Sequence, residues 1–150
     1  PYDNLEVGQQ ASLERTVEER DIQLFAAVSG DNNPVHLDAA FAAETMFKER
    51  IAHGMFCAGL ITCVAGTRLP GPGCVYVDQQ LRFKAPVRIG DNVPALCTIK
   101  EINQERRRVV QETARTVGDT RGARGSSMSN TKRAVRLTAT TRLTCINLPR

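Results

Sequence analysis

The sequence contains no tryptophan, and aromatic residues make up only 5% of its 150 residues. A core must therefore rest on aliphatic side chains, which a hydrophobic content of 41% can supply in a chain of one-domain length. No apolar run approaches the ~18 residues that span a bilayer, and the first ten residues show no basic or apolar signal region. These absences predict one cytoplasmic domain over 1–150 that does not enter a membrane.

The five cysteines also lack a pattern, because their number is odd and no two are separated by just two residues. Each cysteine lies among apolar neighbours, as in the stretch MFCAGLITCVAG. The two histidines do not fall at ligand spacing from the cysteines. We therefore expect reduced cysteines that pack as small hydrophobic residues, with no disulfide scaffold and no metal site.

The net charge of +4 is unevenly distributed, since residues 120–150 hold six arginines and Lys132 but no acidic residue. A basic segment of this kind can bind phosphates or nucleic acid. It has no recognition motif and no aromatic stacking residues, so a solvated strand face with a loop explains it better, and we expect no nucleic-acid partner. Residues 118–132 are rich in Gly, Ser and Arg, which fits either a long loop or an altered stretch of sequence.

The first half of the chain has helical periodicity. Apolar residues at helical spacing predict a helix over about 18–29, with Thr16 and Glu19 as a capping box and Gly30 as its stop. A proline ends the pattern at DNNPVH, and Asp38 then caps a short helix, AAFAAETMF.

The second half begins with an apolar helix and then changes to a period of two. The helix is expected over residues 54–68, and it has so little polar face that a curved sheet must wrap it. After the breaker PGPG, alternating residues predict strands, and one more strand is expected near the N-terminus. The expected strands cover 5–18, 75–87, 93–102, 107–117 and 133–148. Helices followed by meandering strands indicate an α+β fold with an antiparallel sheet.

Two short stretches could carry chemistry. Asp31 and His36 flank a proline-stiffened turn, so a carboxylate and an imidazole could share and move a proton there near neutral pH. By spacing alone, Asx turns with a packed histidine explain this loop better. His53 and Gly54 open the apolar helix, where unpaired N–H groups could form an oxyanion hole, although a simple capping turn is the better interpretation of that pair taken alone.

Together the stretches FAAVSGDNNPVHLDAAFAAETMF, IAHGM and LPGPGCVYVDQQLRFKAPVRIGD resemble the MaoC-like (R)-specific enoyl-CoA hydratases. The resemblance runs in order over about residues 5 to 100, and S-G-D-x-N-P-x-H is its most specific motif. It implies a hot-dog fold, in which an antiparallel sheet wraps a long central helix at about 54–68. It further implies syn addition of water to a trans-2-enoyl-CoA, with no cofactor, in a homodimer. After about residue 104 the chain departs from the family pattern, so the sheet edge and the dimer are less certain there.

The resemblance also assigns roles by position. The catalytic aspartate and histidine fall on Asp31 and His36, and the glycine whose N–H polarises the thioester carbonyl falls on Gly54. Asn33 matches an asparagine that orders the loop, and Thr62 matches a small hydroxyl residue near the aspartate, a weaker assignment. Basic residues near the mouth of the site are candidates for binding the CoA phosphates, although each taken singly fits a solvated strand face better: Arg82, Lys84 and Arg88.

Two other functions remain open from the sequence. Hot-dog proteins also hydrolyse acyl-CoA thioesters, and a fold does not settle its reaction. The basic C-terminal segment alternatively suggests a binding module without catalysis.

Overall fold

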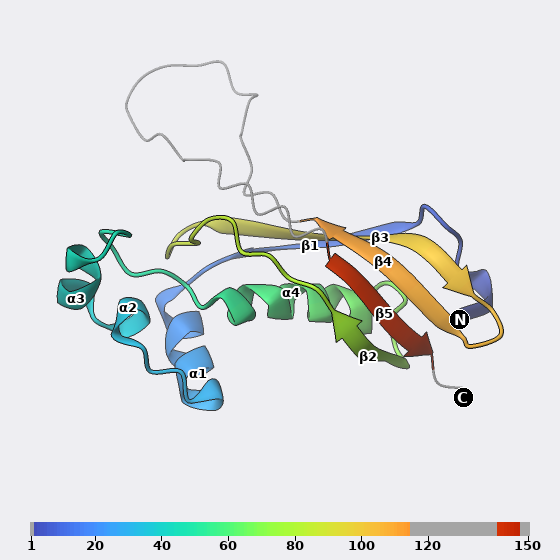
Figure 1. The fold of residues 1–150 in the computed structure, drawn as a ribbon, viewed down its shortest axis with the longest axis horizontal. Coiled ribbons are helices and arrows are strands. Elements are labelled where there is room, and N and C mark those ends of the chain that lie inside the picture. Colours follow the sequence, from blue (N-terminus) through green and yellow to red (C-terminus); the bar gives the residue numbers. More distant parts are fainter. Residues whose placement is uncertain (1, 115–140, 148–150) are drawn as a thin grey trace, which may run out of the picture.

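The computed structural model describes residues 2–114 and 141–147, which form a curved antiparallel sheet lying against one long helix (Figure 1). The long helix, α4 (Gly54–Thr67), crosses the inner face of the sheet, and three shorter helices gather beyond its N-terminal end. This is the predicted α+β hot-dog arrangement, and the central helix ends one residue before the expected 68. None of the described helices has the length and apolar character needed to cross a membrane.

The sheet has five strands in the order β1-β3-β4-β5-β2, and every pairing is antiparallel. The strands are β1 (Gln10–Thr16), β2 (Cys74–Gln79), β3 (Asn92–Asn103), β4 (Arg108–Ala114) and β5 (Thr141–Asn147). The predicted strand over 133–148 is therefore observed only from 141, and its earlier part lies outside the described residues, as does the irregular segment 118–132.

The core lies between α4 and the inner face of β3. The alternation predicted for β3 is confirmed, since Val93, Ala95, Cys97 and Ile99 are all completely buried. From α4, Ile61, Val64 and Ala65 meet this face and are also completely buried. Burial of this kind contributes roughly 25 cal/mol per Å² of apolar surface, so the helix and sheet stabilise each other along their whole contact.

Burial also decides the protonation of Cys97. Removal from water raises the pKa of this thiol to about 12, with a smaller contribution from Cys74. The side chain therefore behaves as a neutral hydrophobic residue in the core.

The predicted strand over 75–87 is too long. A bulge between Tyr76 and Asp78 breaks the alternation, and β2 ends at Gln79. Val75 and Val77 each remain 43% exposed, on the face away from α4, while Tyr76 packs on the core. Residues 80–88 leave the sheet, and this segment passes over the N-terminal half of α4 (Figure 1).

The first long helix, α1, covers Glu19–Ser29 and ends at Gly30 with a positive φ of 77°, as expected. Its predicted capping box is wrong by two residues. Glu18 is the N-cap, and its main-chain N–H donates to the Asp21 carboxylate at 3.0 Å. Asp21 rather than Glu19 is the acidic member of the capping box. Its carboxylate also accepts a hydrogen bond from Arg15 at 2.5 Å, which ties α1 to β1.

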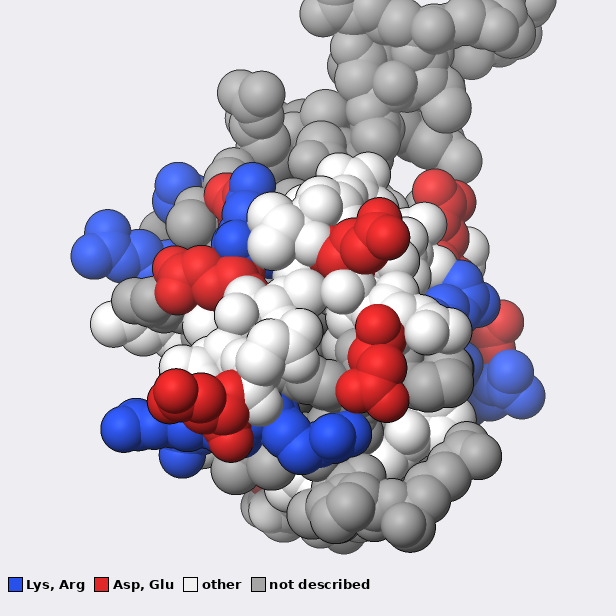
Figure 2. Space-filling view, turned by 90° about the vertical axis from the view of Figure 1, so that its right-hand side faces the viewer, with Lys and Arg blue, Asp and Glu red and all other residues white. Residues whose placement is uncertain are grey.

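Figure 2 shows the end of the molecule remote from the short helices. Acidic and basic side chains are interspersed on that face, and neither sign forms a continuous patch among the described residues there. The basic segment predicted after residue 120 falls largely on residues that are not described.

Candidate active site

The turn between α1 and α2 (Pro34–Leu37) sets Asp31 and His36 at its two ends. Gly30 takes the left-handed conformation that stops α1, and Asn33 then caps α2 by accepting from the Val35 N–H at 3.2 Å. Pro34 occupies the first turn of α2, where its missing N–H costs no hydrogen bond. Asp31 is exposed and its carboxylate accepts from the Asn33 N–H at 3.3 Å, so local bonds hold the turn.

His36 is only 8% exposed, and a main-chain carbonyl fixes its protonation pattern. Its Nδ1 lies 2.7 Å from the carbonyl oxygen of Ile51. A carbonyl can only accept, so Nδ1 carries the hydrogen and Nε2 presents a lone pair. The imidazole is therefore set up to accept a proton at Nε2.

The Ile51 carbonyl is held from several directions. Arg50 binds the carboxylate of Glu19 on α1 through two hydrogen bonds of 2.8 and 2.6 Å, and this guanidinium lowers the pKa of Glu19 below its ordinary value. Ile51 forms an isolated antiparallel bridge with Arg88, and the Ala52 N–H donates to another main-chain carbonyl at 2.7 Å. The acceptor that orients His36 is thus part of the rigid frame.

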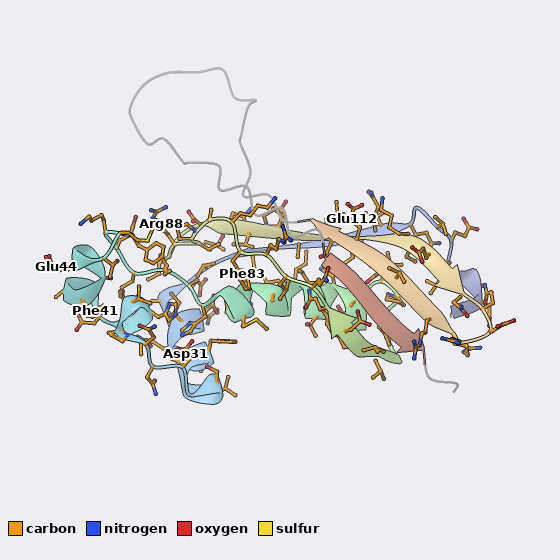
Figure 3. All side chains as sticks on the ribbon, in the orientation of Figure 1. Asp31, Phe41, Glu44, Phe83, Arg88 and Glu112 are labelled. Atoms are coloured by element: carbon orange, nitrogen blue, oxygen red, sulfur yellow. The ribbon has the colours of Figure 1, made fainter. Side chains whose placement is uncertain are left out.

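Gly54 is the first residue of α4, so its N–H points out of the helix without an intrahelical acceptor. The partial positive charge of a helix N-terminus favours a developing oxyanion at this position. A side chain could not be added here freely, because a Cβ on Gly54 would lie 3.0 Å from two ring atoms of Phe83. Figure 3 labels Phe83 in the segment over α4 and Asp31 in the turn between α1 and α2.

Asp31, His36 and Gly54 line one cavity of about 650 Å³. Most of its wall is apolar, with contributions from α1, from the segment before α4 and from the segment over it. The lining includes Phe25, Met46, Phe47, Ile51, Met55, Phe83, Ala85 and Val87. A space with a few converging polar groups in an apolar wall suits a small organic ligand that carries an apolar chain.

His53 completes a cluster with the two predicted catalytic side chains. One ligand-type atom each from Asp31, His36 and His53 lies within 4.8 Å of the others, the only such group of three among the described residues. The two imidazole rings are stacked, with centroids 3.8 Å apart and planes at 30°. A carboxylate and imidazoles at such short range can pass a proton between them.

This geometry agrees with a known family. The model of the MaoC like domain matches residues 4–121, which is most of the chain. The chain belongs to this family.

Relatives of this MaoC-like chain cover most of its length. It is 52% identical over 116 residues to an (R)-specific enoyl-CoA hydratase of Rhodospirillum rubrum, a match that covers 77% of this chain and 81% of the relative. It is 49% identical over 118 residues to a 3-hydroxybutyryl-CoA dehydratase of Methylorubrum extorquens, covering 79% and 75%. The solved R-hydratase of Pseudomonas aeruginosa superposes with a TM-score of 0.75 at 42% identity, covering 97% of this chain and 82% of that one.

The MaoC-like fold brings some predicted site residues together and leaves others apart. Asp31, His36, Gly54 and Lys84 line the cavity, with Lys84 exposed at its edge. Asn33 does not line the cavity but caps α2, which fits its expected part in ordering the loop.

Thr62 and Arg82 are exposed and are not among the residues that line this cavity. Thr62 lies eight residues after Gly54, or roughly 12 Å along a helix that rises 1.5 Å per residue, which explains its separation from Asp31 within this chain. Arg88, a further candidate for CoA binding, pairs with Glu49, and its suggested role stays a prediction. The roles suggested for Thr62 and Arg82 stay predictions.

Sequence reasoning missed the part of the site that depends on long-range contacts. The sequence pattern indicates only a capping role for His53. Its side chain is nevertheless only 2% exposed and contacts both ends of the turn that carries Asp31 and His36. Its only sequence signal is its place before the glycine of IAHGM. Phe83 gave no signal, because its position on Gly54 follows from the early end of β2.

Proposed function

We propose that this protein is an (R)-specific enoyl-CoA hydratase that reversibly adds water in the syn sense to a trans-2-enoyl-CoA. The observation that carries the proposal is the meeting of a carboxylate, an imidazole with a free Nε2 and a helix N-terminal N–H on one apolar cavity. The relatives named as a hydratase and as a dehydratase act in the two directions of such a reaction.

In the proposed mechanism, Asp31 and His36 bind a water molecule and His36 Nε2 removes its proton as the oxygen attacks C3. The electrons of the C2–C3 double bond move toward the thioester, whose oxygen gains negative charge. The Gly54 N–H stabilises that oxygen at the N-terminus of α4. The protonated member of the pair then delivers a proton to C2 on the same face of the double bond. One proton is taken from the water and one is given to C2, so the addition is balanced.

The acyl-CoA substrate fits the lining of the cavity. The apolar wall accepts an acyl chain, and Lys84 at the edge can meet a phosphate of the CoA moiety. No step of this mechanism requires a cofactor.

The direct test follows the loss of the conjugated enoyl absorbance of crotonyl-CoA. Asp31→Asn and His36→Ala should each lose on the order of 10² or more in kcat. Asp38→Asn is the matched control, because it removes a carboxylate from the same loop while asparagine still caps α3 (Ala39–Glu44). Wild-type rates in either site variant would refute the assigned roles.

The configuration of the product is tested by coupling to an enzyme that oxidises only (R)-3-hydroxyacyl-CoA. A thiol reagent in a parallel assay separates hydration from hydrolysis. Release of free CoA without hydration would replace the proposal with a thioesterase.

A homodimer is also part of this proposal. α4 is apolar nearly all round, yet Met55, Thr62 and Cys63 on its outer face are exposed in the single chain. A second copy that covered this face would bury it and would bring Thr62 of each chain into an interface. Sedimentation equilibrium should give twice the chain mass, and a monomer at micromolar concentration would contradict it. The cytoplasmic location expected from the sequence stays a prediction.

A further inference from the structure

We propose that His53, whose side chain forms part of the cavity wall, is a positioning residue of this site that holds Asp31 and His36 in register with Gly54. The role rests on the proposed hydratase function. It is carried by two contacts of one buried side chain with the groups that are assigned to catalysis, and by further contacts that fix His53 itself.

The first contact is a hydrogen bond to the Asp31 main chain. His53 Nε2 lies 3.0 Å from the carbonyl oxygen of Asp31, 22 residues away in the sequence. Because the carbonyl only accepts, Nε2 carries the hydrogen of the His53 ring. The hydrogen bonds that join the Asp31 N–H to Ser29 and the Asp31 carboxylate to Asn33 span two residues each, so they shape the turn without fixing it to the rest of the fold.

The second contact is the stack with His36. The bond from His36 Nδ1 to Ile51 fixes one point of the ring, but the ring could still tilt about that point. His53 closes one face of the ring at a centroid distance of 3.8 Å. A hydrogen bond and a stacked neighbour together set the direction of Nε2, the atom that must reach the water.

Further contacts fix His53 itself. Its backbone is the N-cap of α4, its carbonyl accepts from the Cys57 N–H at 3.3 Å, and its ring packs on Phe25 of α1 at a centroid distance of 4.9 Å. It is also covalently joined to Gly54, the proposed oxyanion donor. One rigid residue thus fixes the positions of the acid, the base and the oxyanion donor relative to one another. Displacement of such groups by about 1 Å can cost on the order of 10²-fold in rate.

The test compares two substitutions that differ in one hydrogen bond. His53→Leu keeps apolar bulk but loses the donor and the ring, whereas His53→Gln keeps an N–H near the position of Nε2. We expect His53→Leu to lower kcat on crotonyl-CoA by about a hundredfold with KM within threefold of wild type, because the other residues that line the cavity are unchanged. His53→Gln should recover at least tenfold of that loss.

Gln111→Leu is the matched stability control. Its buried side chain donates to the Leu69 carbonyl at 2.9 Å, away from the cavity, so its loss destabilises the fold without touching the site. It should lower the unfolding temperature and leave kcat unchanged. Equal kcat losses in Gln111→Leu and His53→Leu would overturn the proposal, because general destabilisation would then explain both.

A spectroscopic readout separates this role from the reaction itself. ¹⁵N spectra of the imidazole groups should show His36 as the Nδ1–H tautomer in wild type. In His53→Leu they should show a mixture of tautomers, because a ring freed to tilt would leave the Ile51 carbonyl part of the time. An unchanged tautomer with unchanged kcat would overturn the positioning role while the hydratase function stands. Absence of hydration by the wild-type protein would overturn the proposed function, and this role with it.

Discussion

Replacement of Gly54 by alanine should separate catalysis from stability. An ideal Cβ at this position lies 3.0 Å from two atoms of the Phe83 ring and 3.2 Å from a third, closer than ordinary contacts of 3.4 Å or more. Phe83 is 51% exposed, so its ring can move aside by a few tenths of an ångström. Alanine also favours a helix by about 1 kcal/mol over glycine in a helix interior, so the free energy of unfolding should change by no more than about 1 kcal/mol.

Activity should respond far more strongly. The new methyl group meets Phe83 where both residues line the cavity, so it should narrow the space in which the thioester oxygen reaches the Gly54 N–H. Weakening of one oxyanion donor typically costs about 10²–10³ in kcat, and a hundredfold loss corresponds to about 2.7 kcal/mol of transition-state stabilisation. The expected loss of transition-state stabilisation is therefore more than twice the expected change in the free energy of unfolding.

The assay combines crotonyl-CoA hydration with thermal unfolding of the same preparations. Gly66→Ala is the control, because its Cβ would meet nothing within 4 Å on the same helix and the residue does not line the cavity. It should gain slight stability and keep full activity. A Gly54→Ala protein with at least half of the wild-type rate would refute the role of this N–H.

Three further predictions concern the frame of the site. Cys97, whose pKa is raised to about 12 by burial, should react with a thiol reagent only on unfolding, and Cys97→Ser identifies its signal in a thiol titration. Burial opposes ionisation of Asp21, but hydrogen bonds from Arg15 and the Glu18 N–H outweigh it and lower the pKa of Asp21. A folded-state pKa below the unfolded value stabilises the fold above about pH 4, so the stability advantage of wild type over Asp21→Asn in denaturant titrations should vanish as the pH falls through the folded pKa. Asp38→Ala removes a cap that accepts two N–H groups and should cost about 1 kcal/mol in unfolding free energy, whereas Asp38→Asn should cost little.

The sequence predicted those features that depend on neighbouring residues. Gly30 stops α1, Asp38 caps α3 and the period of two in β3 gives its buried face, because each of these signals lies within one element. The motif around Asp31 and His36 also identified the family, which the comparison confirms.

The remaining features depend on contacts between distant segments. β2 ends at Gln79, and the residues that then leave the sheet place Phe83 on Gly54. The bond from His53 to the Asp31 carbonyl spans 22 residues and leaves no local pattern in the sequence. A fold-level resemblance implied the catalytic pair and the oxyanion donor, but it said nothing about what holds them in register.

The turn that carries Asp31 and His36 has a consequence for how activity is lost. The acid and the base are five residues apart in one turn, whereas Gly54 is joined to them through contacts between segments, among them the hydrogen bond from His53 to the Asp31 carbonyl. Local opening around the start of α4 would therefore separate the oxyanion donor from an intact acid–base pair. On mild heating, turnover should decline before the helical circular dichroism signal does, which makes hydration a more sensitive reporter of local opening than the content of secondary structure.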